Sequence, residues 1–353
     1  MRYLPLEFGR VLAPRNDPQT LDFKCSCETC VPQSSFIHAA PLKCTQHRYL
    51  RKGFLVDSSG SAGQPTPSEI YCYGIASVFT PTRNRSKGYA KHMMRLLHWV
   101  MAPHSALPPF PTEKWGAPPP SSESGKAKFS ALYSDIGDFY SLCGPGEEAG
   151  SGWAVRGAVW TLWDVSQADR SESESAKMEW EWLDLPEVNA LLQADTEAIK
   201  REMIEWTKST GRRSVAFLPW EGTCLFQIHR ILLSPGVPQP KKWCLRLKDP
   251  LSSSNDEPTF ATWTIDTYSS TTHLVITRLR ATETTFPHLL RKIKQLAREH
   301  GMHKVEVWNL PEELIGTASA LGGETGERDE HLSAFMWYGD GPAGDVEWLF
   351  NEK

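Results

Sequence analysis

The stretch YCYGIASVFTPTRNRSKGYAKHMMRLL, residues 71–97, contains the pattern from which we derive the fold. Its first nine residues form an apolar run of strand length that ends at the turn signal Thr80–Pro81. After a polar loop, apolar residues recur with helical spacing from Tyr89 onward, until Pro103 closes the pattern. The stretch therefore predicts a buried strand, a loop and a helix.

The junction of loop and helix carries the motif R-x-x-G-x-A, formed by Arg85, Ser86, Lys87, Gly88, Tyr89 and Ala90. A helix start leaves backbone N–H groups unpaired and carries the positive end of the helix dipole, so it favours an anion such as a phosphate. Gly88 lets the backbone approach a ligand closely, and Arg85 and Lys87 add positive charge. As a bare string the motif is weak, because it also occurs at ordinary helix starts.

The second half of the chain repeats this order of elements. Residues 260–265 and 273–279 predict two strands, a helix with one apolar face follows until Gly301, and residues 304–308 predict another strand. In the first half, residues 129–136 resume as a strand after a long Pro- and Ser-rich connection. The second turn, ATETTFPHLL, contains no glycine, so we predict that the second domain binds no coenzyme.

Length and charge limit the possible classes of protein. A chain of 353 residues favours two domains, and the polar, acidic segment near 167–177 predicts domains of 1–166 and 181–353 joined by a linker at 167–180. With 38 basic and 42 acidic residues and no basic block, nucleic acid is not expected as a main partner. No apolar run of membrane-spanning or signal-peptide type is found, which predicts a cytoplasmic protein without a membrane partner.

The stretch 71–97 resembles the acetyl-CoA binding motif of the GCN5-related N-acetyltransferases (GNAT). FSALYSDIGDFYSLCG, residues 129–144, adds a second match, because Phe139, Tyr140 and Gly144 fit the F-Y-x-x-x-G of that superfamily's short helix. More narrowly, SCET at 26–29, GIASVFTP, RSKGYA, LYSDIGDFY and GAVWTLWDV are similar to segments of the fungal lysine N6-acetyltransferases. The resemblance spans about residues 24–165, and more loosely the rest.

The resemblance implies an α/β (α+β) GNAT fold with a splayed mixed sheet, followed by a degenerate GNAT-like domain. It implies direct transfer of the acetyl group from acetyl-CoA to a small primary amine, with the side chain of free lysine as the suggested acceptor. Backbone N–H groups at Ser77, Val78 and Phe79 would orient the acetyl and pantetheine arm. Tyr140 would protonate the departing thiolate, because the pKa of a phenol lies near that of the thiol.

The general base is harder to assign. Asp135 and Asp138 lie between the predicted strand and the short helix, where a carboxylate can deprotonate an ammonium directly or through water. Acidic residues at helix starts are, however, usually caps. We take Asp135 and Tyr140 as the candidate catalytic pair.

Two departures from the family pattern lead to a second interpretation. The superfamily begins with a strand and two helices that wall the acceptor site, and no such helices are predicted before Tyr71, so the chain is expected to begin inside the family's domain. Pro145 and the glycine-rich segment after it also depart from the pattern. The alternative is therefore an acetyl-CoA-binding pseudoenzyme or scaffold.

A third interpretation concerns the cysteines near the N-terminus. Cys25, Cys27, Cys30 and Cys44, with His47, offer enough soft ligands for a tetrahedral zinc site, which would make this region a metal-stabilised binding module. The spacing C-x-C-x2-C is not that of a standard zinc finger. Free thiols without metal are the interpretation that we adopt.

Overall fold

The computed structural model describes residues 11–12, 22–23, 43–57, 65–119, 125–148, 150–166, 178–220, 223–233, 240–248, 258–267 and 271–351. These residues form two compact units. The first contains the described residues up to Gly53, together with Ser68–Arg156 and Asp329–Glu347. The second contains the described parts of Phe54–Pro67 and Gly157–Arg328, together with the end of the chain from Trp348.

The two units are interleaved along the chain, whereas the sequence predicted two contiguous domains. The residues of β7 (Val159–Asp164), predicted within 1–166, pair with β13 in the second unit. The residues of β15 (Leu332–Trp337), predicted within 181–353, pair with β5 in the first unit. A strand adds to whichever sheet edge offers matching hydrogen bonds, and this choice leaves no local sequence signal.

The first unit is built on a mixed sheet in which β3, β4, β5, β15 and β6 are neighbours in that order. β4 and β5 are parallel, and β15 is antiparallel to both β5 and β6. The elements of this unit are β1 (Val11–Leu12), β2 (Asp22–Phe23), β3 (Thr45–Val56), β4 (Pro67–Phe79), η1 (Thr82–Asn84), α1 (Tyr89–Met101), η2 (His104–Ala106), α2 (Thr112–Trp115), β5 (Phe129–Ser134), η3 (Phe139–Leu142), β6 (Ala154–Val155), β15 and η5 (Ala343–Asp345).

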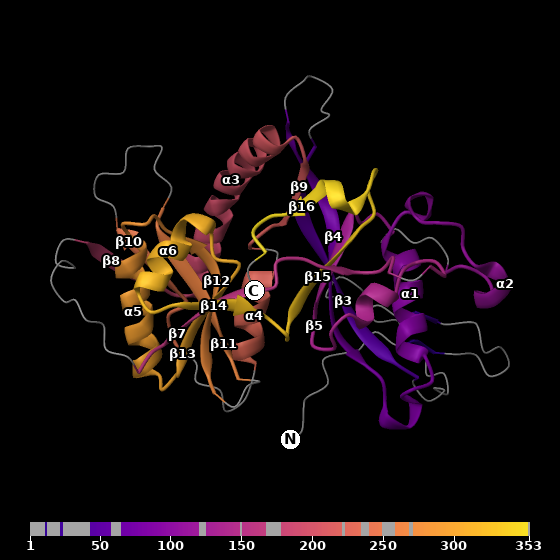
Figure 1. Ribbon diagram of the computed structural model, residues 1–353, viewed down its shortest axis with the longest axis horizontal. Helices are drawn as coiled ribbons and strands as arrows, with labels where there is room; N and C mark the ends of the chain where they lie inside the picture. The colour runs from indigo at the N-terminus through magenta and orange to yellow at the C-terminus, as the bar shows by residue number, and fades with distance from the viewer. Residues whose placement is uncertain are drawn as a thin grey trace. The chain divides into compact units, whose positions relative to one another are not determined.

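Helix α1 lies beside this sheet (Figure 1), and buried apolar side chains attach it there. Met93, Met94, Leu97 and Met101 are fully buried at helical spacing and belong to the same core cluster as Ile75 of β4. Burial of each such side chain contributes about 1.5–3 kcal/mol. The apolar pattern that predicted this helix is thus the face that fixes its position.

The second unit contains a seven-stranded mixed sheet in the order β14-β7-β13-β12-β11-β10-β8, with β12 and β13 parallel and the other pairs antiparallel. Its elements are β7, β8 (Glu179–Leu183), α3 (Leu185–Thr210), β9 (Arg213–Phe217), α4 (Thr223–Leu232), β10 (Cys244–Lys248), β11 (Phe260–Asp266), β12 (His273–Arg280), α5 (Phe286–Glu299), β13 (Lys304–Trp308), α6 (Glu312–Ala320) and β14 (Glu324–Glu327). The last strand, β16 (Val346–Trp348), begins in the first unit and ends in the second.

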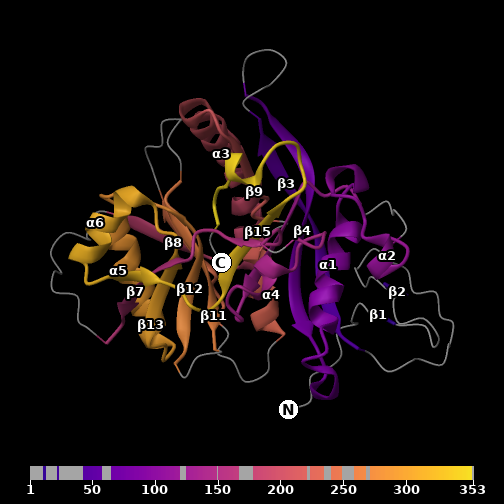
Figure 2. The same ribbon diagram turned by 45° about the vertical axis from the view of Figure 1, so that its right-hand side comes forward.

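Helices cover both faces of this second sheet. α5 and α6 lie on one side and α4 on the other, as Figures 1 and 2 show. All seven residues of β11 are consequently buried, including Thr262, Thr264 and Asp266, which alternate with apolar side chains along the strand.

The α/β fold class predicted from the sequence is confirmed, with two mixed sheets and a strand–helix–strand segment in each unit. The predicted strand at 304–308 coincides with β13, and α1 and α5 lie where the helical periodicity placed them. Among the residues that the structure describes, no helix combines the length and the apolar character needed to cross a membrane.

Candidate functional site

The parallel strands β4 and β5 separate near their carboxyl ends. Their ladder runs from Cys72 opposite Phe129 to Ile75 opposite Leu132, while β4 itself continues to Phe79. Ser77 has a φ of 55°, which is uncommon for a residue with a β-carbon and marks an irregularity in the strand. The predicted pantetheine-orienting backbone at 77–79 therefore lies beyond the β4–β5 ladder.

The side chains of these three residues alternate. Ser77 and Phe79 are exposed, and Phe79 retains 53% of its accessible surface. Val78 packs against the core cluster below α1. The Val78 side chain therefore points into the core, and the backbone at the end of β4 lies beside solvent.

Helix α1 begins in a form that suits an anion. Gly88 is its N-cap residue with φ 79° and ψ 0°, a left-handed conformation, and the first turn holds no acidic side chain. The His92 N–H donates to the Gly88 carbonyl (3.0 Å), so the N–H groups of residues 89–91 precede the first hydrogen bond of the helix. A β-carbon built on Gly88 would meet no atom within 4 Å, so the space beside this backbone is open.

The predicted loop residues before the helix are accessible to solvent. Arg85, Ser86, Lys87 and Gly88 are exposed, and Ser86 also adopts a positive φ of 58°. Arg85 folds back on the loop, because its Nε donates to the Thr80 carbonyl at 3.1 Å. The loop thus combines two positively charged side chains with two residues of positive φ, Ser86 and Gly88, near the helix start.

Tyr89 and Ala90, the last residues of the motif, are half-buried. Lys43 donates to the Tyr89 hydroxyl at 3.0 Å and its Nζ lies 4.8 Å from the centre of the ring. The Asn84 amide in turn donates to the Lys43 carbonyl at 3.3 Å. Lys43 is therefore a cation at the helix start that sequence reasoning missed, because the contact joins residues 46 positions apart.

Tyr140 lies on η3 and is buried, with 8% of its surface accessible. Its ring packs edge-on against Phe139 (5.1 Å between centres) and Trp153 (6.4 Å). Burial, with smaller contributions from the charges of Cys143 and Asp135, raises the pKa of Tyr140 to about 12. The pKa of Tyr140 therefore lies well above the thiol pKa of about 8.5, which it was expected to resemble. Tyr140 is a neutral hydroxyl at neutral pH.

The turn that carries Tyr140 is enclosed by the glycine-rich loop that follows it. The N–H of Gly152 donates to the Ser141 carbonyl (2.9 Å) and that of Trp153 to the Tyr140 carbonyl (3.1 Å). A β-carbon on Gly152 would collide with the Tyr140 carbonyl, and one on Gly144 with the Ser151 side chain. Gly144, predicted from the F-Y-x-x-x-G pattern, is thus required by close packing.

Pro145, which departs from the family pattern, has a structural partner. Its carbonyl accepts a hydrogen bond from Trp99 Nε1 at 2.9 Å, which joins the loop to α1. The loop after Pro145 therefore packs back onto the Tyr140 turn and the helix.

Asp135 follows β5 and is paired with a histidine from the C-terminal part of the chain. Its Oδ1 accepts the backbone N–H of His331 (2.9 Å) and lies 2.7 Å from His331 Nδ1. The Asp135 side chain keeps 60% of its accessible surface. His331 lies 196 positions away in the chain, so no local pattern indicates this pair. Asp138 contributes its backbone carbonyl to Ser141 at 2.7 Å and makes no side-chain cap of η3.

The candidate zinc ligands are only partly within the described residues. Cys25, Cys27 and Cys30 lie outside them. Cys44 is buried, its thiol donates to the Tyr89 carbonyl at 3.5 Å, and burial raises its pKa to about 11. Within the described part of the chain, no group of three or more His, Cys, Asp or Glu side chains is placed to hold a metal ion.

The corresponding helix start in the second unit is built differently. Before α5, the Thr282 N–H donates to the Thr285 hydroxyl (3.0 Å) and the Thr285 N–H to the Thr282 hydroxyl (3.2 Å). The Phe286 N–H donates to the Thr282 carbonyl at 2.9 Å, and Thr285 has a negative φ of −88°. At the start of α5, the threonines thus accept hydrogen bonds from backbone N–H groups. At the start of α1, after Gly88, the N–H groups of residues 89–91 stay open to a ligand. That the second unit binds no coenzyme stays a prediction.

Comparison with known proteins gives one family match. The family model described as "LYC1 GNAT-like C-terminal domain" matches residues 164–353, which is more than half of the chain. This match confirms the predicted GNAT-like character of the C-terminal part. No curated protein matches the sequence.

Three solved structures illustrate the similar proteins. A GCN5-related N-acetyltransferase from Kribbella flavida is 11% identical, with 83% of this chain and 56% of that one covered and a TM-score of 0.43. A probable N-acyltransferase from Enterococcus faecalis is 11% identical, with 84% and 59% covered and a TM-score of 0.45. Saccharomyces cerevisiae N-myristoyltransferase with bound myristoyl-CoA is 10% identical, with 83% and 63% covered and a TM-score of 0.41. The chain thus spans less than two thirds of the length of each.

Proposed function

Because the chain belongs to the family defined by the LYC1 GNAT-like C-terminal domain, we propose that it is an N-acetyltransferase whose acetyl-CoA site lies in its first unit. The observation that carries this proposal is the start of α1. There, Gly88 in a left-handed conformation, an open space beside it and a first turn without acidic side chains form a site for a diphosphate.

The residues around this helix start fit the coenzyme. Backbone N–H groups at the start of α1, those of Tyr89 and Ala90 among them, would bind the diphosphate beside Gly88, and Arg85 and Lys87 would add positive charge at its edge. The backbone at 77–79 would orient the pantetheine arm, because it lies past the last pair of the β4–β5 ladder. Acetyl-CoA supplies an acetyl thioester as the acyl donor.

Transfer of the acetyl group forms an amide bond and breaks the carbon–sulfur bond, so the amine loses a proton and the sulfur gains negative charge. With its pKa near 12, Tyr140 holds its proton and would stabilise the thiolate as a hydrogen-bond donor. Complete transfer from a phenol of pKa about 12 to a thiolate whose conjugate acid has a pKa of about 8.5 costs roughly 5 kcal/mol. The final proton on sulfur would therefore come from solvent.

Asp135 would accept the proton of the amine, directly or through water. Its carboxylate is largely exposed and is oriented by His331, which both donates its backbone N–H and places Nδ1 at 2.7 Å. A carboxylate that a second group orients is the usual arrangement for proton transfer. The aspartate and the phenol are contributed by consecutive elements, the end of β5 and η3.

We propose a small primary amine as the acceptor, with the side chain of free lysine as the first compound to test, and the cytoplasm as the location. The support for lysine is the similarity of GIASVFTP, RSKGYA and LYSDIGDFY to the fungal lysine N6-acetyltransferases. Chemistry alone requires only an unprotonated amine that can reach the thioester.

Calorimetry with acetyl-CoA tests the binding site, and a thiol-release assay over free amino acids and polyamines tests the reaction. Tyr140→Phe should lower kcat about 10- to 150-fold, since a hydrogen bond to a charged group is worth about 1.5–3 kcal/mol, and should leave the Kd of acetyl-CoA unchanged. Tyr71→Phe is the control, because Tyr71 is an exposed tyrosine of β4.

Lack of acetyl-CoA binding by the wild-type protein at millimolar concentration would overturn the proposal. Binding without thiol release for any amine would favour the acetyl-CoA-binding pseudoenzyme. Equal kcat values for the Tyr140→Phe variant and the wild type would remove Tyr140 from the mechanism while leaving the coenzyme site in place.

A further inference from the structure

A continuous chain of hydrogen bonds crosses the core of the first unit. Trp153 Nε1 lies 2.9 Å from Ser130 Oγ, which lies 2.7 Å from the Tyr338 hydroxyl. The same hydroxyl lies 2.8 Å from Nδ1 of His98, and His98 Nε2 lies 2.8 Å from the Cys143 carbonyl. All four side chains are buried, and none of them belongs to the proposed coenzyme or amine site.

The direction of each hydrogen bond follows from the two ends of the chain. The Cys143 carbonyl can only accept, so His98 Nε2 carries the hydrogen. Complete burial keeps the imidazole neutral, because it lowers the His98 pKa to about 3, and Nδ1 is then an acceptor. The Tyr338 hydroxyl must therefore donate to Nδ1 and accept from Ser130.

The Trp153 end of the network gives the same direction for its hydrogen bonds. The indole N–H of Trp153 can only donate, so Ser130 accepts from it and donates onward to Tyr338. The four bonds form one directional chain in which every donor and acceptor on the path is satisfied. Such a network admits a single imidazole tautomer, with hydrogen on Nε2.

Both ends of this chain are attached to the turn that carries Tyr140. The acceptor at one end, the Cys143 carbonyl, belongs to the residue after η3, whose N–H donates to the Tyr140 carbonyl at 3.1 Å. The donor at the other end, Trp153, uses its backbone N–H to bind the same Tyr140 carbonyl at 3.1 Å. The His98 ring also stacks on the Trp153 indole, with centres 4.1 Å apart.

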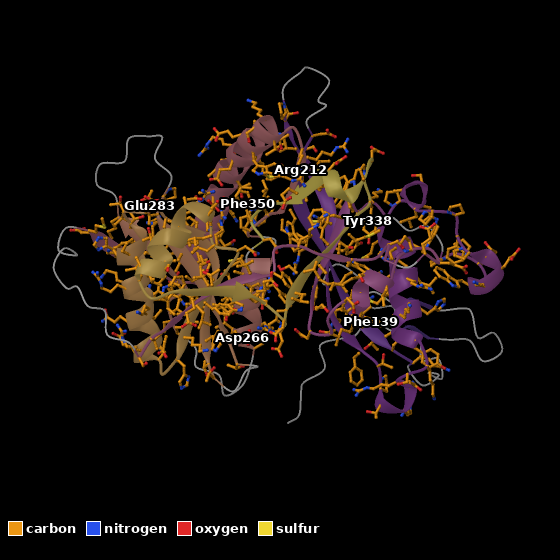
Figure 3. The ribbon with its side chains drawn as sticks, viewed as in Figure 1. Phe139, Arg212, Asp266, Glu283, Tyr338 and Phe350 are labelled. Carbon is orange, nitrogen blue, oxygen red and sulfur yellow. The ribbon has the colours of Figure 1, made fainter. Side chains whose placement is uncertain are left out.

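We propose that His98 is a positioning residue for Tyr140, and that Tyr338, from the C-terminal segment of the chain, holds the imidazole through Nδ1 so that its Nε2–H anchors the Tyr140 turn. This inference rests on the proposed function, since it concerns the same phenol. Figure 3 labels Tyr338, which follows β15, and Phe139, which precedes Tyr140 on η3.

The physical reason is that η3 cannot position its own side chains. It is a 3-10 turn of four residues, and so short a helix has little stability of its own. Its geometry is therefore set by what binds its carbonyl groups from outside. A displacement of a reacting group by about 1 Å can lower a rate on the order of 100-fold, so small losses of anchoring affect turnover.

The test compares Tyr338→Phe with Ser214→Ala. Tyr338→Phe removes only the hydroxyl that links Ser130 to His98. Ser214→Ala removes a buried hydroxyl of similar kind, which lies 2.9 Å from the Thr207 hydroxyl in the second unit. Both variants should lower the melting temperature by a similar amount, and only Tyr338→Phe should lower kcat, by about tenfold or more, with the Kd of acetyl-CoA unchanged.

Two further readouts follow the network itself. In the wild-type protein, 15N NMR of His98 should show hydrogen on Nε2 and a hydrogen-bonded Nδ1. In Tyr338→Phe the hydrogen should stay on Nε2, toward the Cys143 carbonyl, while the Nδ1 resonance shifts to that of an acceptor that has lost its donor. Hydrogen exchange of the Cys143 and Trp153 amides, which bind the Tyr140 carbonyl, should accelerate in Tyr338→Phe and stay unchanged in Ser214→Ala.

His98→Gln, which keeps a donor toward the Cys143 carbonyl, should retain more turnover than His98→Leu.

The inference is overturned if Tyr338→Phe leaves the exchange of these amides unchanged, or if its kcat stays within about twofold of the wild type while its stability falls. A wild-type protein without acetyl-CoA binding overturns the proposed function instead. In that case the exchange measurements and the Nδ1 resonance of His98 still decide whether the network holds the turn, so the two failures are distinguishable.

Discussion

Replacement of Gly88 by alanine isolates the backbone contribution to diphosphate binding. Gly88 has a φ of 79°, and a left-handed conformation costs a residue with a β-carbon roughly 1–2 kcal/mol. The new methyl group meets no atom within 4 Å, so no collision adds to this cost. We therefore expect Gly88→Ala to lower the free energy of unfolding by about 1 kcal/mol.

The effect on acetyl-CoA should be larger than the effect on stability. An alanine at this position relieves its strain by turning φ toward negative values, which redirects the N–H groups at the start of α1 away from the diphosphate. Loss of one hydrogen bond to a charged group costs about 1.5–3 kcal/mol, which corresponds to a Kd about 10- to 150-fold higher. Calorimetry with acetyl-CoA measures this change directly.

Gly211→Ala is the matched control. Gly211 ends α3 with a φ of 69°, and a β-carbon there also meets no atom within 4 Å, but this helix end lies in the second unit. Urea denaturation should show similar losses of stability for both variants, with the Kd of acetyl-CoA changed only in Gly88→Ala. A Kd for Gly88→Ala within threefold of the wild type, together with the expected loss of stability, would refute the role of the backbone N–H groups.

Two further predictions concern charge. Arg85→Ala and Lys87→Ala should each weaken acetyl-CoA binding only about two- to fivefold, and less at high salt, because both side chains are exposed; calorimetry at two salt concentrations checks this. Burial lowers the His98 pKa to about 3 from about 6.5. Below pH 6.5 the imidazole is therefore protonated in the unfolded chain and stays neutral in the folded protein. The free energy of unfolding should therefore fall between about pH 6.5 and pH 3, by about 5 kcal/mol in total from this group, and urea denaturation of His98→Gln should lack this slope.

The sequence predicted those parts of the fold that local periodicity specifies. α1 and α5 each have an apolar face at helical spacing, and β13 is a short apolar run between turn signals, so their residues alone define them. β3, with the sequence TQHRYLRKGFLV, was missed because its basic and polar residues hide the alternation of a half-buried strand. The pairing of β15 with β5 was missed because partner choice depends on contacts across the whole chain.

The candidate site divides in the same way. Its helix start could be predicted, because Arg85, Gly88 and the helix lie together in the sequence and follow a known chemical logic. The contacts of Lys43, His331 and Tyr338 could not, since they join residues 46, 196 and 240 positions apart. The pKa of Tyr140 was expected near that of a free phenol, and burial that only the folded structure reveals raises it.

The coenzyme side and the proton-transfer side of the proposed site are built from different segments of the chain. The diphosphate side of the site is local, because the loop and the start of α1 supply it within residues 80–92. The proton-transfer side depends on the segment Asp329–Glu347, which adds β15 beside β5, pairs His331 with Asp135 and places Tyr338 against His98. Coenzyme affinity and turnover therefore draw on different parts of the chain. A disturbance of the C-terminal segment reaches Asp135 and the Tyr140 turn first, because it contacts them through His331 and Tyr338, whereas the Gly88 carbonyl is bound within α1 by the His92 N–H.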